Sequence, residues 1–213
     1  MKGRLRIPIF LVLGATALGA VTSAVSARTA ADFFTTAPDS IYTLLPQATR
    51  LDMLDYYRFG SEKASQNAFG GEARVTYDSP ASITYTLTEN ASGQLAVMTA
   101  ADADTVLAVV TTLATPHPDS EIRWFSADWK PLAPPDMPLF DDWLSLAGRR
   151  NRDRARLIVP FMLTKAEIDS TATTLTLTGA ARDFVAPGLR AEADSLFIPR
   201  MTFSLRGTKL SRR

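Results

Sequence analysis

Cysteine is absent from this chain of 213 residues, and histidine occurs once, at His117. The absence of cysteine excludes disulfides, thiolate metal sites, thiol nucleophiles and a lipidated cysteine behind an export signal. With a single histidine, a zinc site would need at least two carboxylates from elsewhere in the chain, and no spacing of acids indicates one. We therefore expect no metal and no cofactor.

Motifs that hold nucleotides or calcium are also missing. The sequence has no phosphate-binding glycine loop, no dinucleotide fingerprint, no nucleophile-elbow serine motif and no EF-hand loop. Its 23 Lys and Arg nearly balance its 22 Asp and Glu, and the only basic runs are short, at Arg149–Arg152 and Arg212–Arg213. We therefore expect no nucleic acid as a partner.

The one long apolar run lies at the N-terminus. Cationic residues among the first six precede an uncharged stretch from Ile7 to about Val21, and Val25-Ser26-Ala27 places small residues where a signal peptidase cuts. This pattern predicts a signal peptide over residues 1–27, whose apolar part is short for a membrane span. We expect a soluble protein, periplasmic or secreted after cleavage near Ala27, with no integral membrane segment. Cleavage removes three cations and takes the formal charge from +1 to −2.

Behind the signal peptide, the spacing of apolar residues changes from helical to strand-like at Gly71. Small and polar residues over 28–37 predict a flexible arm. The segment Ala37–Ser40 has the character of a helix start, and the apolar spacing predicts a helix over Gln47–Phe59. Alternating, β-branched segments separated by short turns then predict antiparallel strands at Ala73–Tyr77, Ser82–Thr88, Gln94–Thr99, Val106–Ala114 and Glu121–Ser126.

A proline-rich passage from Pro131 to Pro138 is the best candidate for an internal boundary. After it, we predict a short helix over Leu139–Ala147 and strands at Ala155–Leu163, Thr171–Thr178 and Phe197–Leu205. The predicted fold class is α+β, with N-terminal helices packed on antiparallel β-sheet. Because helices precede strands twice, the order suggests two similar tandem halves, residues 38–132 and 133–213, packed as one body.

His117, Asp119 and Ser120 have the residue types of a hydrolytic triad. Members of a triad approach from separate segments, however, whereas neighbours in a Pro-x-Pro turn point in divergent directions. We interpret Asp119 or Ser120 as a cap of the next turn, and we assign no catalytic residue.

Asp52, Asp55 and Arg58 lie on adjoining parts of the predicted helix Gln47–Phe59. Either the two carboxylates serve acid–base chemistry in a cleft, or they are solvated, with Asp52 near the favourable helix start and Asp55 paired with Arg58. Arg50 stands near the same helix start, where the helix dipole disfavours a cation. We expect Arg50 to pair with a carboxylate elsewhere and to hold the helix to the sheet.

Four aromatic residues are candidates for a binding surface: Tyr56, Tyr57, Trp124 and Trp129. Adjacent Tyr56 and Tyr57 cannot both face the core from one helix, and Trp124 alternates with Phe125 along a predicted strand, so one of those two points away from the main core. Exposed rings of this kind mark surfaces for partners or sugars. The alternative is that a second layer of structure covers them.

The segments Ile41–Pro46 and Arg50–Tyr57, followed downstream by Thr115–Ser120, resemble a family of exported Bacteroidetes proteins classed as a domain of unknown function. The resemblance spans about Pro38 to Leu205. It implies export, and a fold of helix pairs on antiparallel sheets similar to the tandem repeats of β-lactamase-inhibitor-type proteins. It implies no active-site residues.

Two classes of function remain open from the sequence. The first is a non-catalytic binding or interaction module of the cell envelope, whose partner is an unknown envelope protein or a small ligand. The alternative is a carboxylate-dependent hydrolase acting on glycans or peptides, with Asp52 or Asp55 as one of two acids. A lesser possibility is an assembly role, in which an open strand edge captures extended segments.

Overall fold

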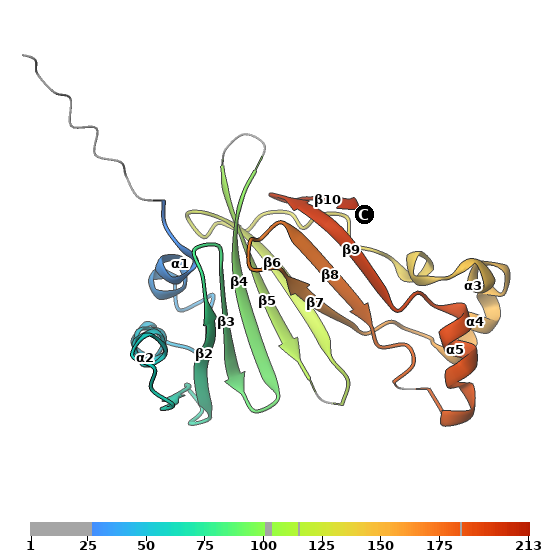
Figure 1. Cartoon of the computed structure of the whole chain (residues 1–213), viewed down its shortest axis with the longest axis horizontal. Helices are drawn as coiled ribbons and strands as arrows, with labels where there is room; N and C mark the ends of the chain where they lie inside the picture. Colours follow the sequence, from blue (N-terminus) through green and yellow to red (C-terminus); the bar gives the residue numbers. More distant parts are fainter. Residues whose placement is uncertain (1–26, 101–103, 115, 184) are drawn as a thin grey trace, which may run out of the picture.

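The computed structural model describes residues 27–100, 104–114, 116–183 and 185–213 (Figure 1). The described chain contains helices and two antiparallel sheets, which confirms the α+β class. Apart from Ala27, the predicted signal peptide lies outside the described residues.

The first sheet has six strands, and their order in space follows the chain. The strands are β1 (Ser65–Gln66), β2 (Glu72–Asp78), β3 (Ser82–Thr88), β4 (Ala91–Thr99), β5 (Thr105–Leu113) and β6 (Asp119–Ser126). The five strands predicted from the sequence therefore form, with ends displaced by up to three residues. Short turns join most of them, which is why consecutive strands pair as antiparallel neighbours.

The second sheet has four strands in the order β10-β9-β8-β7. They are β7 (Thr164–Ile168), β8 (Thr174–Gly179), β9 (Arg200–Arg206) and β10 (Lys209–Arg212). Of these, the sequence predicted β8 and β9 approximately and missed β10.

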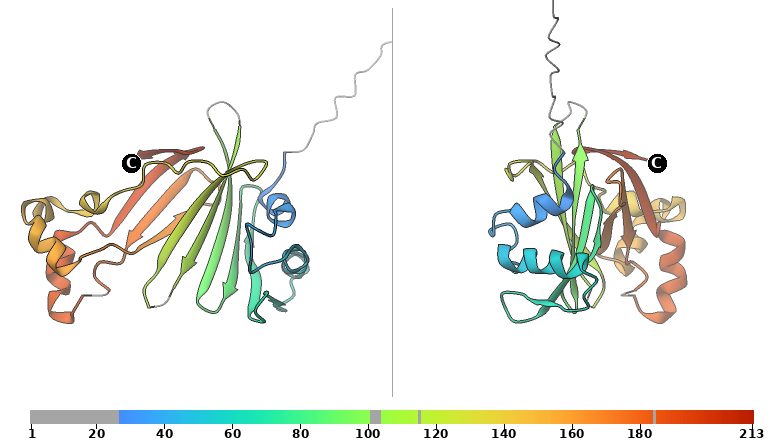
Figure 2. Two further views of the ribbon diagram at one scale, coloured as in Figure 1. Left: turned by 180° about the vertical axis from the view of Figure 1, so that it is seen from behind. Right: turned by 60° about the vertical axis from the view of Figure 1, so that its left-hand side comes forward.

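Both faces of the first sheet are covered (Figure 2). Helices α1 (Ala30–Thr36) and α2 (Gln47–Arg58) pack on one face, and the second sheet lies on the other. Because β5 lies between these two layers, five consecutive residues from Val106 to Val110 are buried instead of alternating. Side chains from both sides of the proline-rich passage share the core between the sheets.

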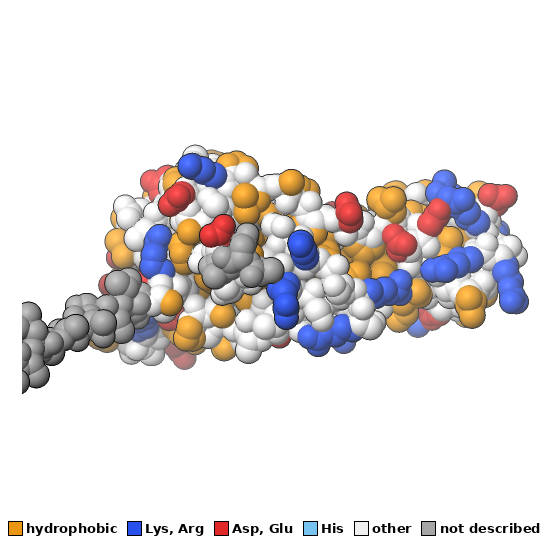
Figure 3. All heavy atoms as spheres, turned by 90° about the horizontal axis from the view of Figure 1, so that it is seen from above, with side chains coloured by type: hydrophobic (Ala, Val, Ile, Leu, Met, Phe, Trp, Pro, Cys, Tyr) orange, Lys and Arg blue, Asp and Glu red, His pale blue; other side chains and the backbone are white. Residues whose placement is uncertain are grey.

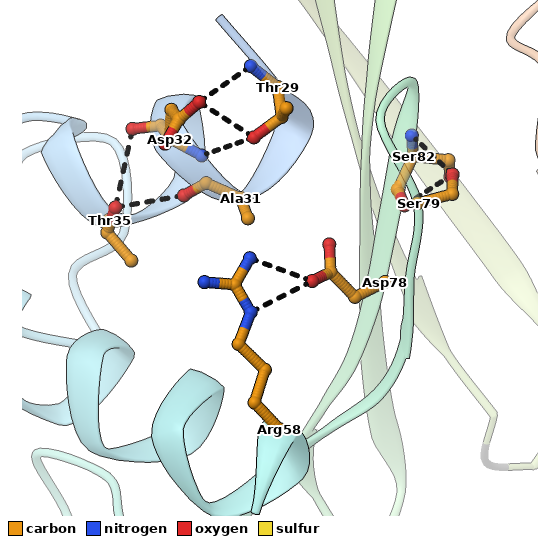
Figure 4. A network of polar contacts seen from close by, with 8 residues as sticks. All are labelled: Thr29, Ala31, Asp32, Thr35, Arg58, Asp78, Ser79 and Ser82. Atoms are coloured by element: carbon orange, nitrogen blue, oxygen red, sulfur yellow. Dashed lines mark hydrogen bonds and ion pairs between the residues drawn. The ribbon is translucent and has the colours of Figure 1, made fainter.

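The flexible arm predicted over residues 28–37 is wrong, because most of it is helix α1. Thr29 and Asp32 form a capping box: the Asp32 amide donates to Thr29 Oγ1 at 3.2 Å, and the Thr29 amide donates to Asp32 Oδ2 at 2.8 Å (Figure 4). Phe33 and Phe34 then enter the core. The sequence pattern Thr-x-x-Asp before an apolar run is the signal from which this helix could have been predicted.

No helix begins at Ala37–Ser40, where a turn leads into α2. The predicted helix start at this segment is therefore wrong. Asp39 Oδ1 accepts a hydrogen bond from the amide of Gln47 at 2.9 Å, so Asp39 satisfies the first turn of α2 from eight residues upstream. Pro46, the residue at the N-cap position itself, makes no side-chain cap.

Arg50 of α2 is fully buried and binds the connection between α1 and α2. Its guanidinium donates to Asp39 Oδ1 at 3.1 Å and to the carbonyls of Ala37 and Leu45. The predicted pairing with a distant carboxylate is therefore present, although it fixes the connection rather than the sheet. Burial lowers the pKa of Arg50, and the Asp39 carboxylate opposes that change.

The end of α2 is tied to the first sheet by Arg58. Its guanidinium donates to Asp78 Oδ2 of β2 at 3.0 Å and 3.3 Å (Figure 4). The predicted pair between Arg58 and Asp55 is not formed. Asp78 on the sheet is partly buried, whereas Asp55, in the preceding turn of the helix, is exposed.

Short helices precede the second sheet and interrupt it: η1 (Phe140–Trp143), α3 (Leu146–Arg150), α4 (Arg152–Ile158), η2 (Pro187–Leu189) and α5 (Arg190–Leu196). The helix predicted over Leu139–Ala147 is therefore two helices with a break at Leu144 and Ser145. The strand predicted over Ala155–Leu163 is wrong: Ala155 and Val159 are buried at helical spacing, and the true strand, β7, begins at Thr164.

The two parts of the chain differ in architecture. The first has six strands with helices packed on a face, whereas the second has four strands with α3, α4 and α5 beyond its end (Figure 1). The arrangement in two similar tandem halves stays a prediction.

The turn between β7 and β8 supplies a test of pH dependence. Burial raises the pKa of Asp169, but the amides of Thr173 and Thr174 and the hydroxyls of Thr171 and Thr173 donate to its carboxylate and outweigh burial, so the pKa lies below its usual value. A carboxyl with a lowered pKa in the folded state stabilises the protein above its unfolded pKa of about 3.9 and loses that effect as the pH falls through the folded value.

We expect Asp169→Asn to lower the free energy of unfolding by about 1 kcal/mol at pH 7, a modest effect because the carboxylate is exposed. The difference between the two proteins should shrink toward zero below pH ~3. Urea unfolding at both pH values measures it. A difference that stays constant with pH would show that the charge of Asp169 is not involved.

Candidate functional site

The four aromatic residues proposed as one surface do not lie together. Trp124 is 2% exposed in the core between the sheets, while Trp129 packs in the other core, against Phe125 at 5.6 Å between ring centroids. On α2, Tyr57 is 38% exposed and Tyr56 is partly buried. The covering second layer, which was the alternative explanation, accounts for Trp124 and Phe125 alike, since each face of β6 meets a different core.

The two sheets are joined by side chains that bind the edge of β7. The amide of Ile168 donates to Gln94 Oε1 at 3.0 Å, and Gln94 Nε2 donates to the Ile168 carbonyl at 2.6 Å. Ser120 Oγ accepts from the amide of Ala166 at 2.9 Å, and Asp119 Oδ1 accepts from that of Thr164 at 3.0 Å. Alternate amides of an edge strand are thus satisfied without a neighbouring strand.

These hydrogen bonds to the edge of β7 give a structural role to two of the three residues that have the types of a hydrolytic triad. Asp119 and Ser120 accept from amides at the edge of β7, whereas the sequence predicted that one of them caps the next turn. His117 lies in the loop before β6.

Between β6 and β7 the sheets leave a pocket of about 280 Å³, which we call the inter-sheet pocket. Apolar side chains from β6, β8, η1 and the proline-rich passage form most of its wall, and polar residues at the start of β6 and β7 complete it. The lining residues are Asp119, Ser120, Ile122, Trp124, Pro134, Met137, Pro138, Trp143, Thr164, Ala166 and Leu177. Polar and apolar atoms contribute about equally to the exposed wall. A small-ligand site combines apolar side chains with polar groups that fix the orientation of the ligand.

Trp124, which lines this pocket, carries a buried donor without an acceptor. Its Nε1 atom has no hydrogen-bond partner among the described residues, although the residue is almost completely buried. A buried N–H group without an acceptor costs about 1–3 kcal/mol. An acceptor that reached this N–H would recover that free energy.

Trp143 forms a second aromatic part of the wall, and a glycine makes room for it. A Cβ atom added at Gly179 of β8 would lie 2.9 Å from Cζ3 of Trp143. The ring is therefore fixed against the backbone of β8. Sequence analysis did not assign Trp143 or Met137 to a site. The only signal in the sequence is that Met137 lies within the proline-rich passage and Trp143 shortly after it.

The other depressions and the exposed acidic residues are weaker candidates for a functional site. A depression of about 860 Å³ includes Ala100 and Asp104, which flank a segment outside the described residues. Asp52 and Asp55 are both exposed on α2, on the face of the first sheet opposite the inter-sheet pocket. Within the described residues, no group of three or more His, Cys, Asp or Glu side chains could hold a metal ion.

None of the helices in the described part of the chain is long and apolar enough to cross a membrane.

Comparison with known proteins agrees with the α+β fold. The chain belongs to the family described as "Protein of unknown function (DUF3256)", whose model matches residues 22–209. The predicted membership of a domain-of-unknown-function family is thereby confirmed. No curated protein matches the chain.

The fold also occurs in a solved structure. The structure of a domain of an uncharacterized protein from Porphyromonas gingivalis W83 is similar, with a TM-score of 0.69 and 17% sequence identity. The match covers 84% of this chain and 96% of the other. At this identity the similarity shows the fold alone.

Proposed function

We propose that this protein is an exported, non-catalytic binding module of the cell envelope, periplasmic or secreted, and that its ligand site is the inter-sheet pocket. Export is supported by the cationic and apolar N-terminal sequence and its small-residue cleavage pattern. Binding is supported by one observation above all, the buried and unsatisfied Nε1–H of Trp124, a residue that lines the inter-sheet pocket.

The pocket defines a class of ligand. Because a cavity of roughly 150 Å³ holds benzene, about 280 Å³ accommodates a compact molecule of roughly ten non-hydrogen atoms. Its surface would be mainly apolar to match the lining formed by Ile122, Leu177 and the two tryptophans. It would carry a carbonyl, carboxylate or ether oxygen toward Trp124.

A matched pair of probes tests this proposal. We expect cyclohexanone, which has an acceptor, to bind about tenfold more tightly than cyclohexane, since one buried hydrogen bond contributes roughly 1–1.5 kcal/mol. Trp124→Phe removes the donor and should abolish the preference. Trp129→Phe removes an indole N–H that is equally without a partner, but in the other core, and should leave the preference unchanged. Calorimetric titration measures all of these affinities.

The proposal fails if neither probe binds, or if Trp124→Phe retains the preference for cyclohexanone. For the alternative, a carboxylate-dependent hydrolase, no observation on the described residues favours Asp52 or Asp55 as half of a catalytic pair.

A further inference from the structure

The helices beyond the end of the second sheet form a surface unlike the rest of the molecule. From Leu146 to Ile158, α3 and α4 contain five arginines and one acid, a formal charge of +4 in a chain whose total is +1. We call residues 146–161 the arginine tip. Lys and Arg side chains gather with apolar ones at this end of the molecule (Figure 3).

Apolar side chains of the arginine tip point away from the core. Gly148 and Ala155 are buried and mark the inner side of α3 and α4. At 100° per residue, positions two before and two after a buried residue lie on the opposite side of a helix. Leu146 lies two before Gly148 and Leu157 two after Ala155, and they are 77% and 73% exposed.

Some arginines hold the tip together, and others have no acidic partner. Arg152 and Arg156 pair with Asp141, and Arg154 pairs with Glu192 of α5. For Arg149 and Arg150, no carboxylate among the described residues forms an ion pair. These two exposed guanidinium groups therefore stand free beside an outward-facing leucine.

This combination fits an anionic lipid surface. Guanidinium groups bind phosphates, and exposed leucines gain free energy by entering the boundary between headgroups and acyl chains. A nucleic acid would use the arginines but not the leucines. We propose that the arginine tip binds anionic membrane surfaces peripherally, with Arg149 and Arg150 on lipid phosphates and Leu146 and Leu157 inserted beside them.

Exposed phenylalanines on the side of α2 provide a control surface for the arginine tip. Phe59, which follows α2, and Phe69, in the turn between β1 and β2, are 86% and 87% exposed, more than the leucines of the tip. Acidic side chains, including Asp55 and Glu62, are exposed near them in the chain. Exposed apolar area is thus present there without the local excess of positive charge.

Sedimentation with vesicles tests the proposal. The protein should bind vesicles of equal parts phosphatidylglycerol and phosphatidylcholine at least tenfold more tightly than vesicles of phosphatidylcholine alone, and 1 M salt should release it. Leu146→Ser/Leu157→Ser and Arg149→Glu/Arg150→Glu should each weaken binding at least tenfold. Phe59→Ser/Phe69→Ser should bind as the unchanged protein does.

Three results would overturn this inference: equal binding to both kinds of vesicle, no vesicle binding at all, or retained binding by both tip variants. Binding to a DNA duplex without binding to vesicles would assign the tip to nucleic acid instead. The measurements on the unchanged protein hold whether or not the variants fold. They are independent of the inter-sheet pocket, so each proposal can fail alone.

Discussion

Arg50→Met is expected to lower the free energy of unfolding by about 3 kcal/mol. Methionine fills much of the same volume but donates no hydrogen bond, so the carbonyls of Ala37 and Leu45 lose the donor that they share. The connection that carries Tyr42 and Leu45 into the core would lose its main restraint. Denaturant unfolding followed by circular dichroism measures the loss.

Two further variants separate geometry from charge at this site. Arg50→Lys should lose most of the same stability, because one ammonium group cannot reach both carbonyls as the guanidinium fork does. Asp39→Asn should cost less than about 1 kcal/mol, since this side chain is 63% exposed and the amide keeps an acceptor for Gln47. If Asp39→Asn proves as damaging as Arg50→Met, the ion pair rather than the buried carbonyls holds the connection.

Gln94→Leu should have a comparable effect, about 3 kcal/mol, through the joint between the sheets. Leucine keeps the size of the side chain but leaves the amide and carbonyl of Ile168 without the partners they have in Gln94. The hydroxyl of Ser82, which is fully buried, loses its donor as well. Because the docked edge of β7 forms part of the inter-sheet pocket, binding of cyclohexanone should weaken together with stability.

The matched control is Glu167→Gln on the same strand. Glu167 pairs with Lys165 at 2.7 Å, but both side chains are about half exposed, so the change should cost less than about 0.5 kcal/mol. Equal losses for Gln94→Leu and Glu167→Gln would contradict the role given to Gln94.

The sequence predicts the individual strands of this protein better than it predicts which helices and sheets cover their faces. Period-two alternation, or in β5 an apolar β-branched run, located β2 to β6. Each of these strands is joined to the next by a short turn, so their pairing is decided within about ten residues of chain. The sequence predictions fail where burial of a side chain depends on segments far away in the chain. Trp124 and Phe125 alternate correctly, but that both are buried depends on a second sheet some forty residues further on.

The segments that carry the family resemblance have a structural explanation. Within Ile41–Pro46, Tyr42 and Leu45 enter the core, and the Ile41 carbonyl accepts from Arg123 of β6 at 2.9 Å. Arg50 opens the second segment and binds the connection between the helices. These residues hold α1 and α2 on the first sheet, on the side away from the inter-sheet pocket.

The candidate site could not be found from the sequence because its wall comes from five separate parts of the chain, namely β6, β7, β8, η1 and the proline-rich passage. Trp124, Trp143 and Leu177 are apolar residues with nothing local to distinguish them from other core positions. What sets Trp124 apart is the absence of an acceptor for its N–H group, which is a property of three-dimensional packing.

The most direct test of the central claim, that the inter-sheet pocket binds a ligand at Trp124, is the ¹H–¹⁵N spectrum of the indole groups during titration with cyclohexanone. The three tryptophans give separate reporters, two in the pocket wall and one in the other core. We predict that the Trp124 resonance moves most, toward the position of a hydrogen-bonded indole, that Trp143 follows, and that Trp129 stays. A spectrum in which Trp124 does not move, or in which all three move alike, would contradict the account.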